Sequence, residues 1–197
     1  MKIKPAVSRR DFLQTTLSVG VALSVPNLLG AESKGQGRLF KVGLIGCGGR
    51  GRGAAQDTLE AGKILGFDVR ITALADYFKD RAVNSAKTFN VPADRCFGGP
   101  TCYQQLLETD VDIVLLVGAP LFRPLHLEAA IKAGKHVYVE KPVAVDPPGC
   151  RRVIAAGEEA KRKGLIITAG TEMRHEFAFR KTHQAVVVEK ALGKLYG

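Results

Sequence analysis

The sequence is poor in the residues that build metal centres and disulfide frameworks. Its 197 residues include only four cysteines and four histidines. Cys47, Cys96, Cys102 and Cys150 form no C-x-x-C pair and have no metal-ligand spacing with the histidines. A resident metal is therefore not expected, and most of the thiols are expected to be free. A disulfide between Cys96 and Cys102 is the alternative, in an oxidising compartment.

Acidic residues are also in deficit. Nineteen Asp and Glu face 29 Lys and Arg, which gives a formal net charge of +10. Such a balance can indicate nucleic-acid binding. Here the basic residues are dispersed and no aromatic-basic stripe accompanies them, so nucleic acid is not an expected partner.

No apolar run near the N-terminus is long enough to span a bilayer. Lys2 and Lys4 precede "SRRDFLQ", with its paired arginines, and the short apolar stretch "TTLSVGVALSVPNLLG". This order predicts a twin-arginine export signal over residues 1–31, followed by a linker over 32–38. The signal implies the twin-arginine translocation machinery as a partner and a location in the periplasm or cell envelope of a bacterium. An amphipathic first helix with two surface arginines is the alternative.

From residue 39 onward, apolar β-type runs alternate with helical stretches. Strands are expected at 39–45, 67–76, 95–97, 111–118, 136–140 and 165–170, and helices at 54–65, 79–89, 103–109, 124–134 and 148–163. Strands that are apolar at every position, such as 113–117, are typical of sheets covered on both faces. Strict alternation with right-handed crossovers predicts an α/β fold, a doubly wound parallel sheet over residues 39–171.

The turn after the first expected strand is rich in glycine. It matches G-x-G-x-x-G with Gly46, Cys47, Gly48, Gly49, Arg50 and Gly51. Gly46 permits a tight turn, Gly48 admits a pyrophosphate and Gly51 allows close helix packing. Backbone N–H groups and the helix dipole then bind the phosphates. These residues predict a Rossmann-type dinucleotide site, against the alternative of a glycine turn that binds nothing.

The second expected strand ends in an acidic residue, Asp76. A carboxylate at this place can accept hydrogen bonds from the adenosine ribose. It repels a 2′-phosphate and so favours NAD, whereas the nearby Lys79 and Arg81 favour NADP, which stays the alternative cofactor. An ordinary strand-end aspartate is the structural alternative.

The segment "AGKHVYVEKPVA" carries the most specific signal in the chain. Together with "DVDIVLLVGAP", His126, the glycine turn and Asp76, it resembles the Gfo/Idh/MocA family of sugar and cyclitol oxidoreductases over about residues 40–197. Glu140-Lys141-Pro142 is the diagnostic signature. The resemblance implies that Lys141 reaches the nicotinamide and the substrate hydroxyl. It further implies that Glu140 lies by the nicotinamide ribose and that Pro120 and His126 border the same pocket.

Glu140 and Lys141 also follow the fifth expected strand directly, at the edge where open α/β sheets bind ligands. A partly desolvated lysine beside a cationic cofactor would have its ammonium form disfavoured and could serve as a general base. We also expect a cis peptide between Lys141 and Pro142 from the resemblance. The alternative is a Glu-Lys pair on a surface turn.

Three further residues are candidates on weaker grounds. His126 stands in an otherwise apolar helix start, where a structural role competes with a role in the pocket. Arg174 and His175 lie in "GTEMRHE", which resembles the family's segment leading into the substrate cleft. They are candidates for substrate contact, or else solvated helix-start residues.

The resemblance ends early, because the sequence stops at "ALGKLYG". In the family this phrase opens the first strand of a substrate domain. Residues 172–197 are therefore interpreted as the connection to, and the start of, a truncated C-terminal domain. A full-length protein is expected to be a homo-oligomer.

Three functions follow as hypotheses. The first is an exported NAD-dependent oxidoreductase acting on a sugar, sugar derivative or cyclitol, with Lys141 as proton acceptor. The second is an NAD-dependent glycosidase that uses transient oxidation and elimination. The third is a non-catalytic dinucleotide-binding module.

Overall fold

The computed structural model describes residues 37–194. The expected export signal and most of the expected linker lie outside the described residues.

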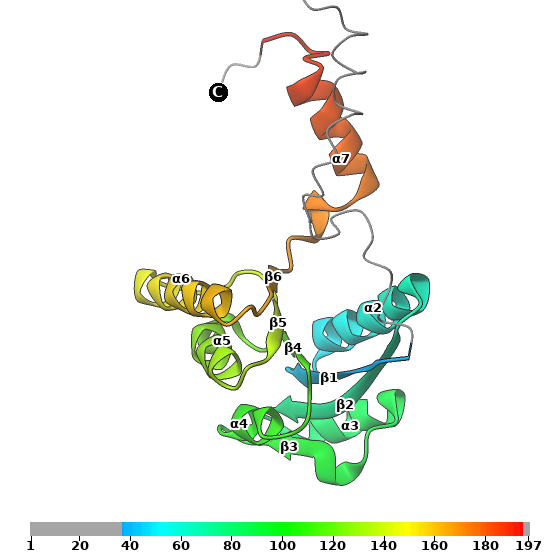
Figure 1. The fold of residues 1–197 in the computed structure, drawn as a ribbon, viewed down its shortest axis with the longest axis vertical. Helices are drawn as coiled ribbons and strands as arrows, with labels where there is room; N and C mark the ends of the chain where they lie inside the picture. The colour runs from blue at the N-terminus through cyan, green and yellow to red at the C-terminus, as the bar shows by residue number, and fades with distance from the viewer. Residues whose placement is uncertain (1–36, 195–197) are drawn as a thin grey trace, which may run out of the picture. The chain divides into compact units, whose positions relative to one another are not determined.

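Six parallel strands form one sheet, and their bounds follow the alternation of the sequence (Figure 1). The strands are β1 (Leu39–Ile45), β2 (Asp68–Asp76), β3 (Cys96–Gly98), β4 (Ile113–Leu116), β5 (His136–Val139) and β6 (Ile167–Ala169). They lie in the order β3-β2-β1-β4-β5-β6, and every neighbouring pair is parallel. The order reverses direction between β1 and β4, which is the point where such sheets bind ligands.

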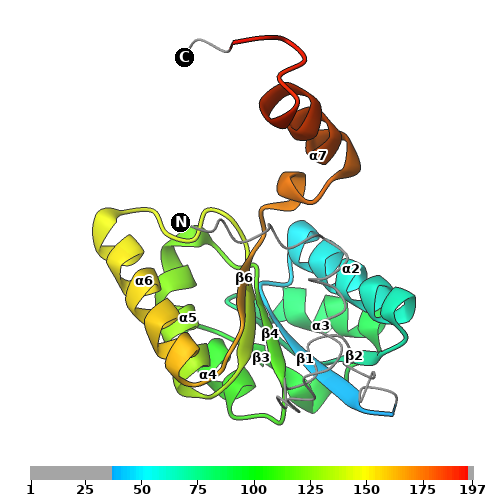
Figure 2. The same cartoon turned by 45° about the horizontal axis from the view of Figure 1, so that its top comes forward.

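Helices cover both faces of this sheet. They are α2 (Gly49–Leu65), α3 (Lys79–Phe89), α4 (Cys102–Leu107), α5 (Arg123–Lys132) and α6 (Pro147–Arg162), with short 3-10 turns η1 (Ala93–Arg95) and η2 (Pro120–Phe122). Figure 2 shows α4, α5 and α6 on one side of the strands and α2 and α3 on the other. The predicted doubly wound α/β fold is therefore confirmed.

Strand β4 shows why its sequence is apolar at every position. Val114 and Leu116 point into the core beneath α4, α5 and α6, whereas Ile113 and Leu115 point into the core beneath α2 and α3. Successive strand side chains alternate between faces, and here each face has a helical layer to pack against. Val114, Leu115 and Leu116 are each at most 2% exposed.

Helix α6 is capped as its sequence predicts. The side chain of Asp146 accepts a hydrogen bond from the N–H of Gly149 at 2.6 Å, which satisfies one of the free donors of the first turn. At the other end Gly164 follows the helix with φ +67°, a left-handed conformation that glycine adopts without strain.

The main difference from the predicted elements is the start of α2. The sequence places this helix at 54–65, but it begins at Gly49, so the second half of the glycine motif is its first turn. Glycines have low helix propensity, and local pattern therefore does not identify them as helical. The helix starts at Gly49 because the glycine turn packs closely against β1 and β4.

The described residues after β6 form η3 (Glu172–Arg174), α7 (Phe177–His183) and a π-type turn, η4 (Gln184–Val188). No strand forms in the described part of this segment, 172–194, and the end of the expected "ALGKLYG" strand lies outside it. Within residues 37–194, no helix combines the length and apolarity that crossing a bilayer requires.

Candidate functional site

The glycine turn at the end of β1 is shaped by close backbone contacts. Gly46 has φ +100°, and a Cβ on it would lie 2.4 Å from the backbone nitrogen of Gly118. A Cβ on Gly51 would lie 1.8 Å from the carbonyl oxygen of Gly46. By contrast, apart from Gly48 itself and its two chain neighbours, no residue places a heavy atom within 4 Å of the Cβ position of Gly48. Two glycines are thus required by the fold, while the third borders open space of the kind that a pyrophosphate would occupy.

The first turn of α2 offers hydrogen-bond donors beside this space. The N–H of Arg52 donates to the carbonyl of Gly48 at 3.0 Å. The N–H groups of Gly49 and Arg50 come before this bond, in the first turn of α2, where a helix offers them no acceptor. The first turn contains no acidic residue. An anion placed here would meet free donors and the positive end of the helix dipole, so the arrangement fits the phosphates of a dinucleotide.

Asp76 lies at the end of β2 and holds the glycine turn. Its Oδ2 accepts the N–H of Cys47 at 2.7 Å, and its Oδ1 accepts the N–H of Phe78 at 3.0 Å. The residue is 7% exposed. A carboxylate has about four lone-pair sites, so two bonds leave capacity for ribose hydroxyls.

Cys47 offers little to a ligand directly. Its N–H is engaged by Asp76, and burial, with the Asp76 charge, raises the pKa of its thiol to about 12. Burial also raises the pKa of the Cys96 and Cys102 thiols. All four cysteines are free. The prediction of free thiols is therefore confirmed, and the Cys96–Cys102 disulfide does not form.

A cavity of about 560 Å³ opens beside Asp76, between the ends of β1, β2 and β4 and the start of α5. It is lined by Asp76, Gly46, Arg81, Gly118, Phe122 and His126, among others. The cavity thus brings together the glycine turn, Asp76 and His126. Pro120, Glu140 and Lys141 are not among its lining residues.

His126 is held in this cavity wall by aromatic rings. It stacks on Tyr103 with ring centroids 4.3 Å apart and on Phe122 at 6.0 Å. Burial lowers the pKa of His126 to about 4, so the imidazole is neutral near pH 7. It therefore borders the cavity as an uncharged aromatic wall.

Glu140 follows β5 and lies in a polar network that the sequence does not reveal. Nε of Arg50 donates to its Oε1 at 2.7 Å, and the Tyr138 hydroxyl contacts the same oxygen at 3.3 Å. Glu140 is 3% exposed. Burial alone would raise the pKa of its carboxyl, but the hydrogen bonds from Arg50 and from the Lys141 amide outweigh this effect, so the pKa of Glu140 is lowered. Arg50, a predicted cofactor-binding residue, pairs with Glu140, with Glu172 at 2.9 Å and with Asp57 at 3.5 Å, and its contact with the cofactor stays a prediction.

Lys141 begins the turn after Glu140. Its N–H donates to Oε2 of Glu140 at 2.7 Å, and its peptide bond to Pro142 is cis, as predicted. The residue itself is exposed. The desolvation that would suit a general base is therefore not supplied by the described residues and would have to come from bound ligands.

Arg123, at the start of α5, is a residue of this region that the sequence analysis missed. Its Nε donates to the carbonyl of Gly118 at 3.1 Å, and its Nη1 donates to the carbonyl of Pro142 at 2.5 Å. No sequence signal marks it, because both partners are backbone carbonyls, and a backbone carbonyl leaves no mark in the residue types.

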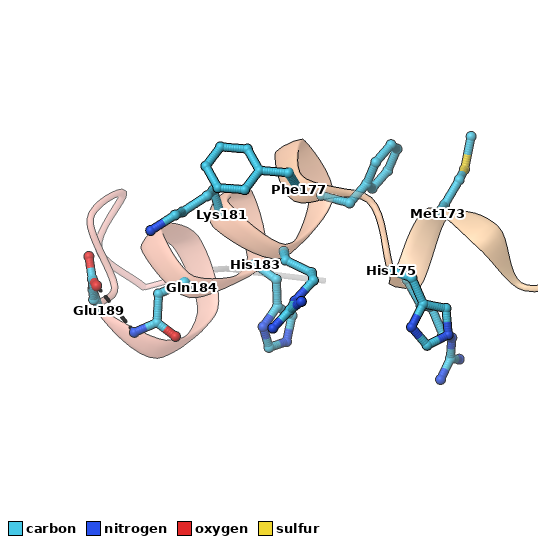
Figure 3. Close-up of a pocket in the computed structure, with 10 residues that line it drawn as sticks. Met173, His175, Phe177, Lys181, His183, Gln184 and Glu189 are labelled. Carbon is cyan, nitrogen blue, oxygen red and sulfur yellow. Dashed lines mark hydrogen bonds between the residues drawn. The ribbon is translucent and has the colours of Figure 1, made fainter. Parts of the chain in front are cut away.

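Arg174 and His175 line a different hollow, of about 1280 Å³, along η3, α7 and η4 (Figure 3). Within it, Lys181 lies over the ring of Phe177, and the side-chain amide of Gln184 donates to Glu189 at 3.2 Å. Every lining residue of this hollow is exposed. The structure does not bring Arg174 or His175 into the cavity of Asp76 and His126, so substrate contact by these two residues stays a prediction.

Known proteins are similar to this chain in sequence and fold. A family model described as "Oxidoreductase family, NAD-binding Rossmann fold" matches residues 40–171. A glycosyl hydrolase family 109 protein from Solibacter usitatus is 29% identical over 168 residues, 79% of this chain and 37% of the relative. An inositol 2-dehydrogenase from Paracoccus denitrificans is 27% identical over 158 residues, 80% of this chain and 43% of the relative.

Among solved structures, a 3-ketoreductase from Actinomadura kijaniata, in complex with TDP-benzene and NADP, is similar with a TM-score of 0.62 and 29% identity. The match covers 76% of this chain and 43% of that one. The chain thus spans about two fifths of the length of these relatives. The family match covers most of the chain and coincides with the parallel sheet and its glycine turn, so the chain belongs to the Gfo/Idh/MocA oxidoreductase family and carries its NAD-binding Rossmann domain.

Proposed function

We propose that the protein is an exported NAD-dependent oxidoreductase that transfers a hydride between a nicotinamide cofactor and a sugar, sugar derivative or cyclitol. The observation that carries the proposal is the placement of Glu140-Lys141-Pro142 at the carboxyl end of β5, on the same sheet edge as the glycine turn. Relatives named as an inositol dehydrogenase and a 3-ketoreductase support this class of substrate.

The residues of this chain divide the work. The N–H groups at the start of α2 hold the phosphates, and Asp76 holds the ribose. When bound, the nicotinamide supplies the hydride acceptor. Lys141, as the free amine, takes the proton from the carbinol oxygen while the hydride leaves the carbinol carbon, so a ketone and a protonated lysine remain.

NAD is the proposed cofactor because Asp76 presents a negative charge to the site. The neighbouring Arg81 lines the same cavity, and a solved relative contains NADP. NADP is therefore the alternative, and the ratio of the two dissociation constants decides between them.

The test replaces Lys141 by alanine in the product of the complete reading frame. NADH formation with a panel of sugars and cyclitols should fall by roughly 10²–10⁴, because the positioned base is lost. NAD affinity should change little, since the glycine turn and Asp76 are untouched. Lys161→Ala, which removes another exposed lysine at the end of α6, is the matched control. Turnover by Lys141→Ala at the control's rate would contradict the proposal.

A glycosidase is the second candidate, and the similarity to the glycosyl hydrolase family 109 protein favours it. In this reaction a ring hydroxyl is oxidised to a ketone, and the neighbouring C–H then loses its proton. The glycosidic C–O bond breaks, so that the aglycone leaves by elimination. Water adds to the resulting double bond, and the hydride returns to the ketone. Net redox change is zero. Release of sugar from aryl glycosides without accumulation of NADH would identify it.

A non-catalytic dinucleotide-binding module is the third candidate, and NAD binding without turnover on any panel substrate would identify it.

Export is proposed from the paired arginines of residues 1–31, which lie outside the described residues. Replacing Arg9 and Arg10 by lysine should retain the protein in the cytoplasmic fraction, and unchanged localisation would contradict export.

A further inference from the structure

Arg123 is placed where a cation is unfavourable. It is 6% exposed, and burial lowers the pKa of its guanidinium. It is the first residue of α5, where the helix dipole disfavours positive charge. No carboxylate of residues 37–194 forms an ion pair with it. The charge of Glu140 favours the guanidinium without pairing with it, and the guanidinium donates its N–H groups to two backbone carbonyls.

The two contacts of Arg123 join segments that the chain order keeps apart. Gly118 follows β4, and its backbone also packs against Gly46 of the glycine turn. Pro142 follows Lys141 in the turn after β5. The planar guanidinium holds both carbonyls at 3.1 and 2.5 Å, which a flexible ammonium with one point of charge does not reproduce.

The turn after β5 is therefore held from two sides. Before Lys141, the Glu140 carboxylate is bound by Arg50 and by the Lys141 N–H. After Lys141, the Pro142 carbonyl is bound by Arg123. Lys141 itself is exposed, and within residues 37–194 its one hydrogen bond runs from its own N–H to Glu140. The direction in which its side chain leaves the sheet edge depends on its two neighbours.

We propose that Arg123 is a positioning residue for Lys141: by tying the Pro142 carbonyl to the loop after β4, it aims the lysine along the same edge as the glycine turn. The proposal rests on the proposed function of Lys141 as proton acceptor. It assigns to Arg123 no contact with cofactor or substrate.

The experiment compares Arg123→Met with Arg152→Met in the product of the complete reading frame. Arg152 is the control, because it joins the second turn of α6 to Glu128 of α5 through a surface ion pair and, among the described residues, hydrogen-bonds to Glu128 and not to the turn after β5. Hydrogen exchange of the peptide covering 140–146 should speed up at least tenfold in Arg123→Met only. Peptides over the glycine turn, 46–51, and the affinity for NAD should match the control.

Turnover supplies the second measurement. Arg123→Met should lower kcat by about 10²-fold with the KM for NAD unchanged, since a displacement of about 1 Å costs that much. Arg123→Lys should restore only part of the rate, because an ammonium cannot hold the two carbonyls in the same fork. It also replaces the methionine variant if that one does not fold.

Four outcomes separate the ideas. Faster exchange over 140–146 with a lower kcat supports the proposal. Exchange and kcat equal to those of Arg152→Met overturn it, as does a failure of both Arg123 variants to fold. The fourth outcome is a wild type that turns over no substrate, while exchange over 140–146 is still faster in Arg123→Met. In that case Arg123 does hold the turn after β5, but the proposed function fails, and with it the positioning role for Lys141.

Discussion

The carboxylate of Asp76 accepts the backbone N–H of Cys47 at 2.7 Å, so the acid at the end of β2 holds the glycine turn at the end of β1. One residue thereby joins the two parts of the candidate cofactor site. Replacing Asp76 should consequently lower both the stability of the fold and the affinity for the cofactor.

Asp76→Ala should lower the free energy of unfolding by about 1–3 kcal/mol, because the buried N–H of Cys47 loses its charged acceptor. It should also narrow the gap between the dissociation constants of NAD and NADP. Urea denaturation and calorimetric titration measure the two effects. Asp68→Ala removes an equal charge at the exposed opposite end of β2 and is the control. An unaltered NAD-to-NADP ratio would speak against the ribose role.

Gly48→Val should abolish dinucleotide binding and leave folding intact. The backbone of Gly48 has φ −72°, which any residue adopts, and apart from its two chain neighbours no other residue places a heavy atom within 4 Å of its Cβ position. The added side chain would occupy the space needed by a pyrophosphate. Calorimetric titration with NAD and the thermal denaturation curve check both halves. NAD affinity equal to wild type would remove the turn from the site.

Gly46→Ala should behave in the opposite way. Its φ of +100° strains any L side chain, and the new Cβ would approach the Gly118 nitrogen to 2.4 Å. We expect a loss of more than about 2 kcal/mol in the free energy of unfolding. Gly157→Ala, at an open position in α6, should not destabilise and serves as the comparison. Equal denaturation midpoints for the two variants would refute the assigned geometry.

His126 predicts a pH dependence of stability. Its pKa is about 4 in the folded chain and near 6.5 when unfolded, so the unfolded state binds more protons between these values. Stability should fall as pH drops below 6.5 and level off near 4, by on the order of 1–2 kcal/mol at pH 5. His126→Phe keeps an aromatic ring beside Tyr103 and should remove this part of the dependence. Urea midpoints at pH 7 and pH 5 measure it, and an equal drop in both proteins would contradict the assignment.

Much of the fold could be predicted from local pattern. The bounds of β1 and α3 match the predicted ranges, and the Asp146 cap and the Gly164 stop lie where the sequence indicates. These features depend on residues close together in the chain, so their propensities are visible in sequence. The start of α2 at Gly49 was missed because packing, and not propensity, makes the glycines helical.

The candidate site likewise combines motifs that the sequence identifies with contacts that only the tertiary structure determines. The glycine turn, Asp76 and Glu140-Lys141-Pro142 could be identified from the sequence, because each motif is contiguous and follows a recognisable strand. The partners of those residues were decided by the tertiary structure alone: Asp76 with Cys47, Arg50 with Glu140, and Arg123 with the Gly118 and Pro142 carbonyls. Those contacts join positions up to 90 residues apart. They form because parallel strands gather their carboxyl ends at one edge, and no local sequence pattern records which side chains meet there.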